Sequence, residues 1–309
     1  MKNIPPQQLQ SYSPPIGGDE TVIHIPVLLE EAVRLLAPKA GETYLDLTAG
    51  YGGHASRIIE VIGAASATLV DRDDQAITHL VPYGDAGARL IHADFASAAE
   101  HLVAANEAFD MICVDLGVSS PQLDEAERGF SIKHDGPLDM RMDRSGTRTA
   151  ADIVNHMSEG NLARMIEHYG EEPRGKAARI AHAIRLNRPL ASTSELARVI
   201  TTAHRGAWTK IHPATRTFQA IRIALNDELG QLERLLPLLP RLLNKGGRVV
   251  MISFHSLEDR LVKRYFAEQD QSGYEAELST LIKKPILGAE YDTTNPRARS
   301  AILRAAVKP

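Results

Sequence analysis

Two short polar segments of this chain concentrate side chains that could bind a ligand or move a proton. The first runs from Asp46 to His54 and reads Asp-Leu-Thr-Ala-Gly-Tyr-Gly-Gly-His. The second runs from Asp115 to Gln122 and places a carboxylate, a glycine, two hydroxyls, a proline and an amide within eight residues. In open α/β sheets, ligands bind just outside the carboxyl ends of the strands. Because each segment follows a short apolar stretch, we expect both to lie at such an edge.

The elements that must position these segments alternate between short apolar strands and helical stretches. Strands are predicted over residues 43–47, 67–71, 88–92 and 109–114, and each of the first three is followed by a helix. Such alternation indicates right-handed crossovers and a parallel sheet.

The pattern after residue 114 is different. Three helices are predicted over residues 158–169, 176–187 and 192–204, the last with the capping-box spacing Ser192 to Glu195. A long helix over 215–236, a fifth strand over 248–253 and a final edge strand over 300–307 are expected to follow.

These elements predict an α/β fold, a doubly wound sheet with an inserted helical domain. Residues 1–20 are rich in Pro, Gln, Ser and Gly, and a disordered arm is expected there. Residues 21–125 and 215–309 are assigned to the sheet domain. Residues 126–214 are assigned to the helical insertion.

Composition excludes several classes of protein. The 309 residues include one cysteine, Cys113, so neither internal disulfides nor a cysteine-rich zinc site is expected. No metal-ligand spacing appears, and no metal site is predicted. The chain shows neither a membrane-length apolar run nor the pattern of a signal peptide, which favours the cytoplasm.

Charge is distributed unevenly. The net charge of −4 argues by itself against a nucleic-acid partner. Residues 160–222, however, hold eleven Lys and Arg against four Asp and Glu, a local balance of +7 that leaves −11 for the rest. Such asymmetry is typical of a lobe that faces a polyanion. Amphipathic helices with solvated arginines would give the same pattern.

The first polar segment is typical of a nucleotide-type cofactor site. Gly50 to Ala55 has the pattern G-x-G-x-x-A, and Asp71 stands 21 residues after Gly50, where a carboxylate can accept from ribose hydroxyls. The pattern fits a nicotinamide cofactor or S-adenosylmethionine. Asp46 favours the second, because it would repel a pyrophosphate and suits a cationic sulfonium and ammonium. The structural alternative for Asp71 is a helix N-cap, a role that Asp73 or Asp74 could also fill.

The end of the third strand leaves two interpretations open. Asp94 could accept from the exocyclic amine of an adenine, and Phe95 could cover the face of that ring. A turn aspartate and a core phenylalanine explain the same residues equally well.

Several longer strings are similar to those of one known family. The chain resembles the bacterial 16S ribosomal RNA cytosine-N4 methyltransferases, the ribosomal RNA small subunit methyltransferase H family, from residue 24 onward. The resemblance rests on residues 46–54 and 115–124 and on Glu127-Arg-Gly-Phe-Ser131, Asp135–Asp143, His212–Ala220, Ser253–Arg260 and Asn295–Ser300.

The resemblance implies a class I S-adenosylmethionine-dependent methyltransferase fold with a helical insertion. It implies S-adenosylmethionine as methyl donor and a cytidine of the decoding region of 16S rRNA as acceptor. Family cofactor positions fall on Gly52, Gly53, His54, Asp71, Phe95, Asp115 and Gln122.

Methylation of an exocyclic amine suggests roles for the second polar segment. The N4 lone pair of cytosine is delocalised into the ring, so catalysis must come mainly from positioning and electrostatics. We hypothesise that Asp115 lies between cofactor and amine and that Ser119 or Ser120 accepts from N4. The alternatives are an Asp115 that serves only the cofactor and serines that cap the next turn.

The acceptor base must leave its stack to enter such a site. Predicted RNA contacts are Arg141, Arg144, Arg174, Arg216, Arg222 and His255. The expected partner is 16S rRNA or the small ribosomal subunit, and a homodimer is left open. An NAD-dependent oxidoreductase and a non-catalytic RNA-binding module are the rival hypotheses.

Overall fold

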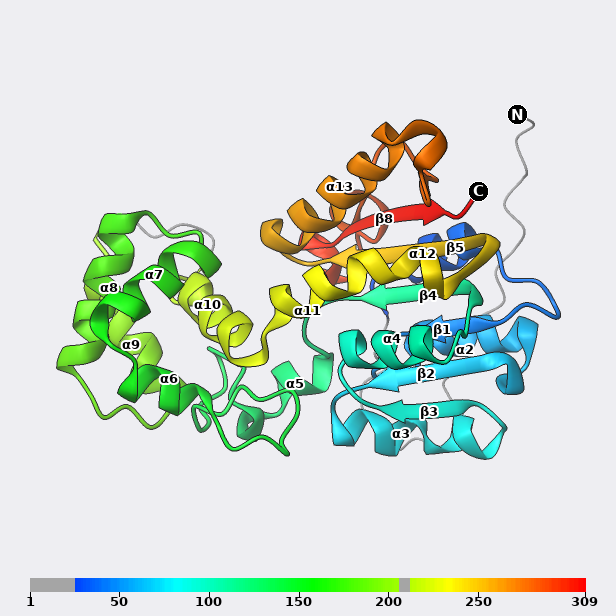
Figure 1. Cartoon of the computed structure of the whole chain (residues 1–309). Coiled ribbons are helices and arrows are strands. Elements are labelled where there is room, and N and C mark those ends of the chain that lie inside the picture. Colours follow the sequence, from blue (N-terminus) through cyan, green and yellow to red (C-terminus); the bar gives the residue numbers. More distant parts are fainter. Residues whose placement is uncertain (1–25, 206–211) are drawn as a thin grey trace.

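The computed structural model describes residues 26–205 and 212–309 of the chain. They form a sheet lobe and a helical lobe that lie side by side (Figure 1). The arm predicted for residues 1–20 lies outside the described residues. Within those residues, no helix is both long enough and apolar enough to cross a membrane.

The strands of the described residues join in one sheet, in the order β3-β2-β1-β4-β5-β8-β6, with β7 also paired to β8. They are β1 (Tyr44–Asp46), β2 (Ala67–Asp71), β3 (Arg89–His92), β4 (Phe109–Asp115), β5 (Leu243–Ser253), β6 (Ser279–Thr280), β7 (Ile286–Leu287) and β8 (Ile302–Val307). Strands β1 to β5 are parallel and β8 runs antiparallel to β5. The carboxyl ends of β1 to β5 therefore share one edge, the carboxyl edge, which faces the helical lobe (Figure 1).

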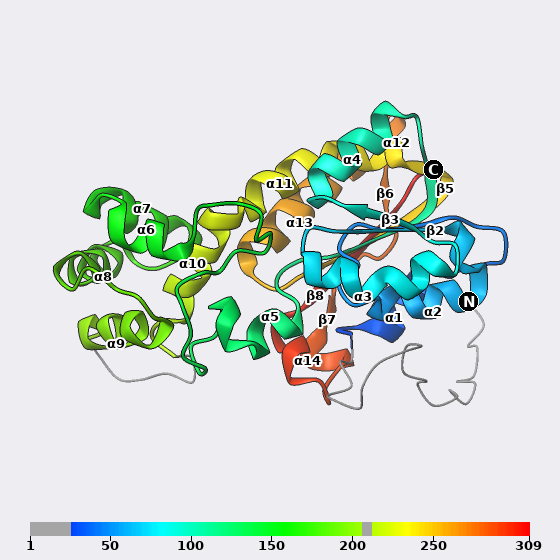
Figure 2. The same ribbon diagram turned by 90° about the horizontal axis from the view of Figure 1, so that it is seen from below.

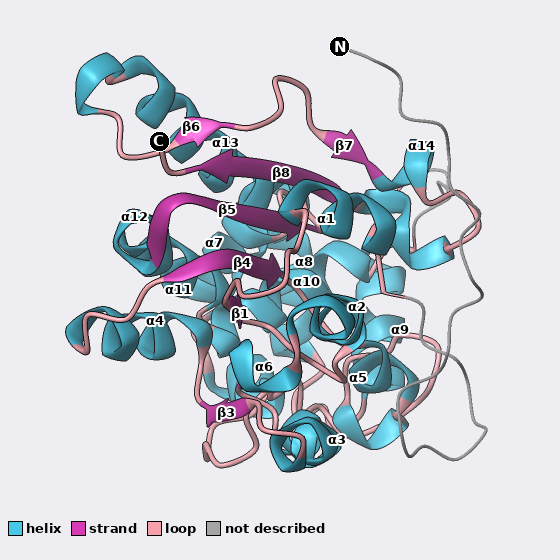
Figure 3. Cartoon of the chain, turned by 90° about the vertical axis from the view of Figure 1, so that its right-hand side faces the viewer, coloured by secondary structure: helices cyan, strands magenta, loops and turns pink. Residues whose placement is uncertain are grey.

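Helices cover both faces of the sheet (Figures 2 and 3). One face is packed by α1 (Leu29–Leu36), α2 (Gly53–Ile62) and α3 (Asp74–Asp85), and the other by α4 (Phe95–Ala104), α11 (Glu228–Leu235), α12 (Leu239–Leu242) and α13 (Ser256–Gln271). A sheet covered on both faces needs strands that are apolar on both faces. Met111 to Val114 in β4 meet this requirement, since all four residues are fully buried.

The helical lobe has a hydrophobic core of its own. Its helices are α6 (Ala150–His156), α7 (Glu159–Tyr169), α8 (Arg174–Leu186), α9 (Thr193–Ala203) and α10 (Thr215–Asn226). Leu162, Ile180 and Leu196 are fully buried in this core. The predictions for α7, α8 and α9 are confirmed, and so is the capping box between Ser192 and Glu195. Helix α6 was not predicted.

The prediction of one long helix over residues 215–236 is wrong. The chain leaves helical geometry at Asp227, whose φ of 52° separates α10 from α11. The buried side chain of Asn226 explains the break. Its Nδ2 donates to the Met140 carbonyl and its Oδ1 accepts from the Met142 amide, both at 2.9 Å. These bonds tie the end of α10 to the helical lobe while α11 turns onto the sheet.

The final strand is not at an edge, contrary to the prediction. One side of β8 pairs with β5, and its other side pairs with β6 and β7. Two-residue strands such as β6 and β7 are too short to give a periodic sequence signal.

The boundary between the lobes differs from the one drawn from sequence. Helix α10 packs into the core of the helical lobe through Phe218 and Ile221, although residues 215–309 were assigned to the sheet domain. We propose Asp227 as the second boundary. The first boundary, between residues 125 and 126, stays a prediction.

Candidate active site

Asp46 ends β1 as a buried carboxylate at the carboxyl edge. Its Oδ2 accepts a hydrogen bond from the Tyr44 hydroxyl at 2.7 Å, and its Oδ1 accepts from the Thr48 amide at 3.1 Å. Burial, helped by the nearby charge of Asp71, outweighs these bonds and raises the pKa of Asp46 to about 7. The protein therefore compensates this negative charge incompletely, and a cation would be stabilised beside it.

The loop after β1 is fastened to the end of β2. The Gly50 amide donates to Asp71 Oδ2 at 2.7 Å, and the Asp73 amide donates to Asp71 Oδ1 at 2.8 Å. Burial is the main cause that raises the pKa of Asp71. Each carboxylate oxygen has a second lone pair, so Asp71 can still accept from a ligand hydroxyl.

The two glycines that open α2 leave no room for a side chain. Gly52 is the N-cap residue with a φ of 81°, and an added Cβ would lie 2.7 Å from the ring of Tyr83. At Gly53, the first residue of α2, a Cβ would lie 2.4 Å from Pro26. The start of α2 is therefore held close to its neighbours, as a loop that binds a ligand through its backbone amides requires.

Asp73, rather than Asp71, caps α3. Asp73 Oδ1 accepts from the Gln75 amide at 3.1 Å, so the structural alternative for Asp71 does not apply. The other oxygen, Oδ2, accepts from Gln122 Nε2 at 2.8 Å and lies 2.8 Å from the Arg128 guanidinium. Gln122, a predicted cofactor residue, is thus buried against the end of β2.

Asp94 also caps its own helix. It accepts from the amides of Ala96 and Ser97 at 3.1 and 2.9 Å and from the Ser97 hydroxyl at 2.7 Å. The turn interpretation applies to Asp94, and the hypothesis that it binds an adenine amine has no support from this geometry. Phe95 opens α4 and is half-buried against the second face of the sheet. Its role as a ring cover stays a prediction.

Asp115 ends β4 with one oxygen that is not satisfied. Its Oδ1 is buried and has no hydrogen-bond partner among the described residues. Its Oδ2 lies 3.7 Å from His54 Nδ1. Burial, together with the charges of Asp46 and Glu258, raises the pKa of Asp115 well above its usual range. Since a buried unpaired acceptor is costly, the geometry fits a ligand that brings a hydrogen-bond donor or a positive charge to Oδ1.

The first of the two serines after Asp115 has a structural role. Ser119 is the N-cap of α5 (Ser120–Asp124) in a capping box with Gln122, whose Oε1 accepts from the Ser119 amide at 3.0 Å. Ser120 is buried. The predicted alternative of a capping serine is realised by Ser119, and contact of either hydroxyl with an N4 amine stays a prediction.

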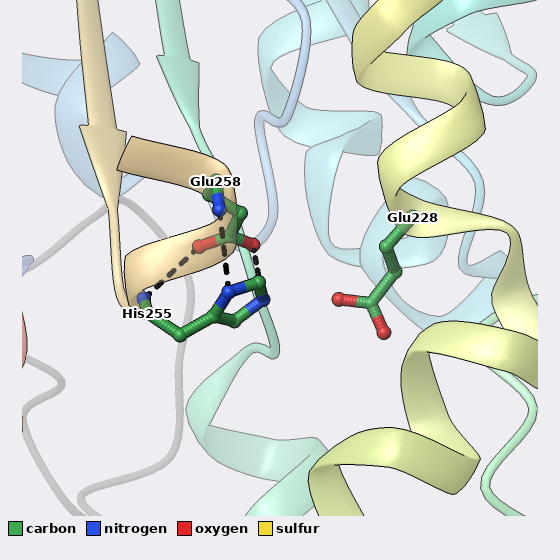
Figure 4. Close-up of side chains that lie close together, drawn as sticks. All are labelled: Glu228, His255 and Glu258. Atoms are coloured by element: carbon green, nitrogen blue, oxygen red, sulfur yellow. Dashed lines mark hydrogen bonds and ion pairs between the residues drawn. The ribbon is translucent and has the colours of Figure 1, made fainter. Parts of the chain in front are cut away.

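His255 was predicted to contact RNA, but its side chain is only 8% exposed. It is the N-cap of α13, in a capping box with Glu258. Ser256 follows as the first residue of α13, and its hydroxyl donates to Glu171 of the helical lobe. His255 faces a buried cluster with Glu228 and Glu258 (Figure 4).

Arg222 is not available to bind phosphate, contrary to the prediction. Its Nε and NH2 donate to the two oxygens of Glu228 at 2.9 and 2.8 Å, and its side chain is 15% exposed. A buried bidentate pair of this kind commits the guanidinium to its partner.

The other predicted arginines lie apart from this cluster. Arg141 is held by Asp139 at 2.7 Å and by backbone carbonyls. Arg144, Arg174 and Arg216 are exposed. Arg216 donates to the Glu171 carbonyl at 3.1 Å. RNA contact by these residues stays a prediction.

Two charged residues of the site were not identified from sequence. Arg128 is 2% exposed and connects Asp73 to the carbonyls of Arg141 and Met142. Glu258 is equally buried and binds the amides of Phe254 and His255. The only signal for either was its presence in a string shared with the resembled family, because an arginine or glutamate in a loop is usually exposed.

The carboxyl edge thus gathers Asp46, Asp71 and Asp115 from three adjacent parallel strands. Their incompletely compensated charges fit a ligand that carries positive charge and hydroxyl donors. S-adenosylmethionine has both, in its sulfonium, its ammonium and its ribose.

Comparisons with known proteins agree with this chemistry. A family model described as the MraW methylase family matches residues 21–309. The ribosomal RNA small subunit methyltransferase H of Synechocystis sp. is 47% identical over 296 residues, covering 92% of this chain and 93% of that protein. The protein of the same name from Acidobacterium capsulatum is 47% identical over 298 residues, covering 92% and 98%.

A solved structure described as an rRNA methylase from Streptococcus thermophilus is also similar, with a TM-score of 0.41 and 9% identity over 93% of this chain and 99% of that one. The family model spans nearly the whole chain. The chain therefore belongs to the MraW methylase family.

Proposed function

We propose that this protein transfers the methyl group of S-adenosylmethionine to N4 of a cytidine in the decoding region of 16S rRNA. The observation that carries the proposal is the buried Oδ1 of Asp115, which has no partner in the described part of the chain and lies beside two further carboxylates at the carboxyl edge. The names of the relatives, which are ribosomal RNA small subunit methyltransferases, support the substrate.

In this proposal, the acids at the edge hold the cofactor. Asp71 accepts from ribose hydroxyls, the amides at the start of α2 meet polar groups of the ligand, and Asp46 lowers the energy of its positive charge. When bound, S-adenosylmethionine supplies an electrophilic methyl group.

Asp115 then acts on the acceptor. Its Oδ1 accepts a hydrogen bond from the N4 amine, which turns the amine out of conjugation and returns its lone pair to nitrogen. As the new N–C bond forms and the bond from the methyl carbon to sulfur breaks, the amine would lose a proton to Asp115 Oδ1, and Asp115 needs no unusual basicity to accept it from the cationic nitrogen. The rate enhancement comes mainly from orientation and from the fixed negative charge.

The helical lobe is proposed to bind the RNA. It adjoins the carboxyl edge and carries the local excess of Lys and Arg, so phosphates beside the target base would lie against it. Arg144, Arg174 and Arg216 are its proposed phosphate contacts. The cytoplasm is the proposed compartment, since ribosomal subunits are assembled there in bacteria. A homodimer stays a prediction, which light scattering can check.

The test is methyl transfer from labelled S-adenosylmethionine to small ribosomal subunits that lack this modification, followed by nucleoside analysis. N4-methylcytidine is the expected product. Transfer to a different base or atom would refute the assignment of the acceptor. The rival hypotheses make other predictions: an oxidoreductase would bind NAD in place of S-adenosylhomocysteine, and a non-catalytic module would methylate no RNA.

A further inference from the structure

Glu228, His255 and Glu258 form a buried polar cluster just beyond the carboxyl end of β5 (Figure 4). Glu228 opens α11, His255 is the N-cap of α13, and Glu258 lies in the first turn of α13. One nitrogen or oxygen atom of each lies within 4.8 Å of those of the other two. Their side chains are 8%, 8% and 3% exposed. No described step of the proposed reaction uses this cluster.

The hydrogen bonds of His255 determine which ring nitrogen carries the hydrogen. Its Nδ1 accepts from the Glu258 amide at 3.3 Å, so in the neutral ring the hydrogen is on Nε2. Nε2 lies 3.2 Å from Glu258 Oε1, but it has no well-aligned acceptor within the described ranges 26–205 and 212–309. Figure 4 shows this side of the ring turned toward the Glu228 carboxylate. The cluster therefore offers one buried donor beside two acceptors.

These residue types could suggest a divalent metal, but their hydrogen bonds argue against one. An Nε2 that carries hydrogen has no lone pair for a metal. The charge of Glu228 is already matched by the bidentate Arg222. Glu258 accepts from the amides of Phe254 and His255.

A group that fits this cluster must accept from His255 and donate to a glutamate. A single oxygen that lies about 2.8 Å from His255 Nε2 and from a glutamate oxygen could bridge the two, because these atoms lie within 4.8 Å of one another. A hydroxyl meets both requirements, whereas an ammonium group only donates and a phosphate only accepts.

The cluster also lies next to the reacting edge. Ile252 of β5 pairs with Asp115 of β4, and the Leu116 amide donates to the Ile252 carbonyl at 2.9 Å. His255 follows three residues later. Gly117 packs against Phe254, since a Cβ there would lie 3.2 Å from the Phe254 ring. A nucleotide whose base reaches Asp115 would therefore bring its sugar close to this cluster.

We propose that the Glu228–His255–Glu258 cluster binds the 2′-hydroxyl of the target nucleotide. The 3′ and 5′ oxygens inside an RNA chain are esterified, so the 2′-hydroxyl is the sugar group that can both accept and donate. This inference rests on the proposed function, and it would make the enzyme select RNA over DNA at the reacting position.

The test uses small subunits reconstituted with ligated 16S RNA that carries either cytidine or 2′-deoxycytidine at the methylated position. The wild-type protein is expected to lose about tenfold or more in kcat/KM on the deoxy substrate, as for a hydrogen bond in a buried site. His255→Asn keeps a side chain suited to capping α13 but removes the Nε2 donor. This variant should lose a similar factor on cytidine and show no further loss on deoxycytidine. His101→Asn, an exposed histidine of α4, is the matched control and should keep the full discrimination.

The outcomes separate the two proposals. Equal rates of the wild-type protein on both substrates would overturn this inference and leave the proposed function intact. A water molecule would then be the group that bridges the cluster. Discrimination that persists in His255→Asn would also overturn it. If the wild-type protein methylated neither substrate, the proposed function itself would fall, and the inference with it.

Discussion

His54 and Asp115 face each other across the carboxyl edge, with His54 Nδ1 3.7 Å from Asp115 Oδ2. The second ring nitrogen, Nε2, hydrogen-bonds to the Val27 carbonyl at 3.0 Å and therefore carries hydrogen. In a neutral ring, Nδ1 would then point a lone pair at a carboxylate. A proton on either group removes this repulsion.

The first prediction concerns Asp115. Asp115→Asn removes the negative charge but keeps the shape of the side chain, and kcat for methyl transfer should fall at least about 100-fold. The thermal midpoint should stay the same or rise, because a poorly compensated buried charge is lost. Asp124→Asn, at an exposed residue of α5 paired with Arg297, is the control and should keep its activity. Undiminished turnover by Asp115→Asn would remove Asp115 from the mechanism.

The second prediction is a pH dependence of cofactor binding. Asp46 has a pKa of about 7 without ligand. A bound cation lowers that pKa, so binding releases a proton and affinity for S-adenosylmethionine should rise between about pH 6 and 8 and then level off. S-adenosylhomocysteine, which lacks the sulfonium charge, should show a smaller rise. Calorimetry across this range measures both, and a flat profile for S-adenosylmethionine would contradict the role of Asp46.

A third prediction follows for the stability of the ligand-free protein. Because the folded pKa of Asp46 is raised above its unfolded value, its contribution to stability is greatest at low pH and is lost as pH rises through about 7. Asp46→Asn should therefore raise the free energy of unfolding by about 1–3 kcal/mol at pH 8 relative to the wild type. It should also weaken S-adenosylmethionine binding. Denaturant titrations at pH 5 and 8 would refute this if the variant gained nothing at the higher pH.

A fourth prediction separates Arg222 from Arg174. Arg222→Ala leaves Glu228 buried without its partner and should lower the free energy of unfolding by about 3–5 kcal/mol. Arg174→Ala should leave stability unchanged, weaken RNA binding several-fold and reduce the salt dependence of binding by about one unit of slope. Chemical denaturation and RNA titrations at several salt concentrations measure these effects. A stable Arg222→Ala variant with weakened RNA binding would restore Arg222 as a phosphate contact.

The fifth prediction concerns Arg128, which joins the end of β2 to the segment before α6. Arg128→Ala removes the cation beside the buried Asp73 and the donor to two carbonyls, and it should cost about 3–5 kcal/mol of stability. Arg128→Lys keeps the charge but cannot form the same fork and should recover only part of this loss. Arg148→Ala, at an exposed arginine, should have no measurable effect. Equal stability of the two alanine variants would refute the role of Arg128.

The parallel strands were predictable because a strand buried on both faces leaves an uninterrupted apolar run. Asp46, Asp71 and Asp115 could be placed at one edge for the same reason, since each ends such a run. The break at Asp227 could not be predicted, because it depends on hydrogen bonds between Asn226 and residues more than eighty positions earlier.

The pairing of buried charges could not be predicted from the sequence either. Arg222 and Arg174 have the same side chain and lie in the same basic stretch, yet one is bound to Glu228 and the other is exposed. The cap at His255 was missed because Ser256, a far commoner N-cap residue, follows directly. In both cases the deciding contact is tertiary.

The interrupted sheet has a consequence for the order in which the protein is made. Strands β1 to β4 leave the ribosome before the helical lobe, while β5 and β8 emerge after it. The core of the helical lobe is complete by residue 226, so this lobe can fold before the remaining strands are made. The sheet cannot be completed before residues 243–307 are made. Until then, the edge of β4 that will pair with β5 has no hydrogen-bond partners from that strand. The growing chain therefore carries a folded helical lobe beside an unfinished, pairing-prone sheet until its last residues appear.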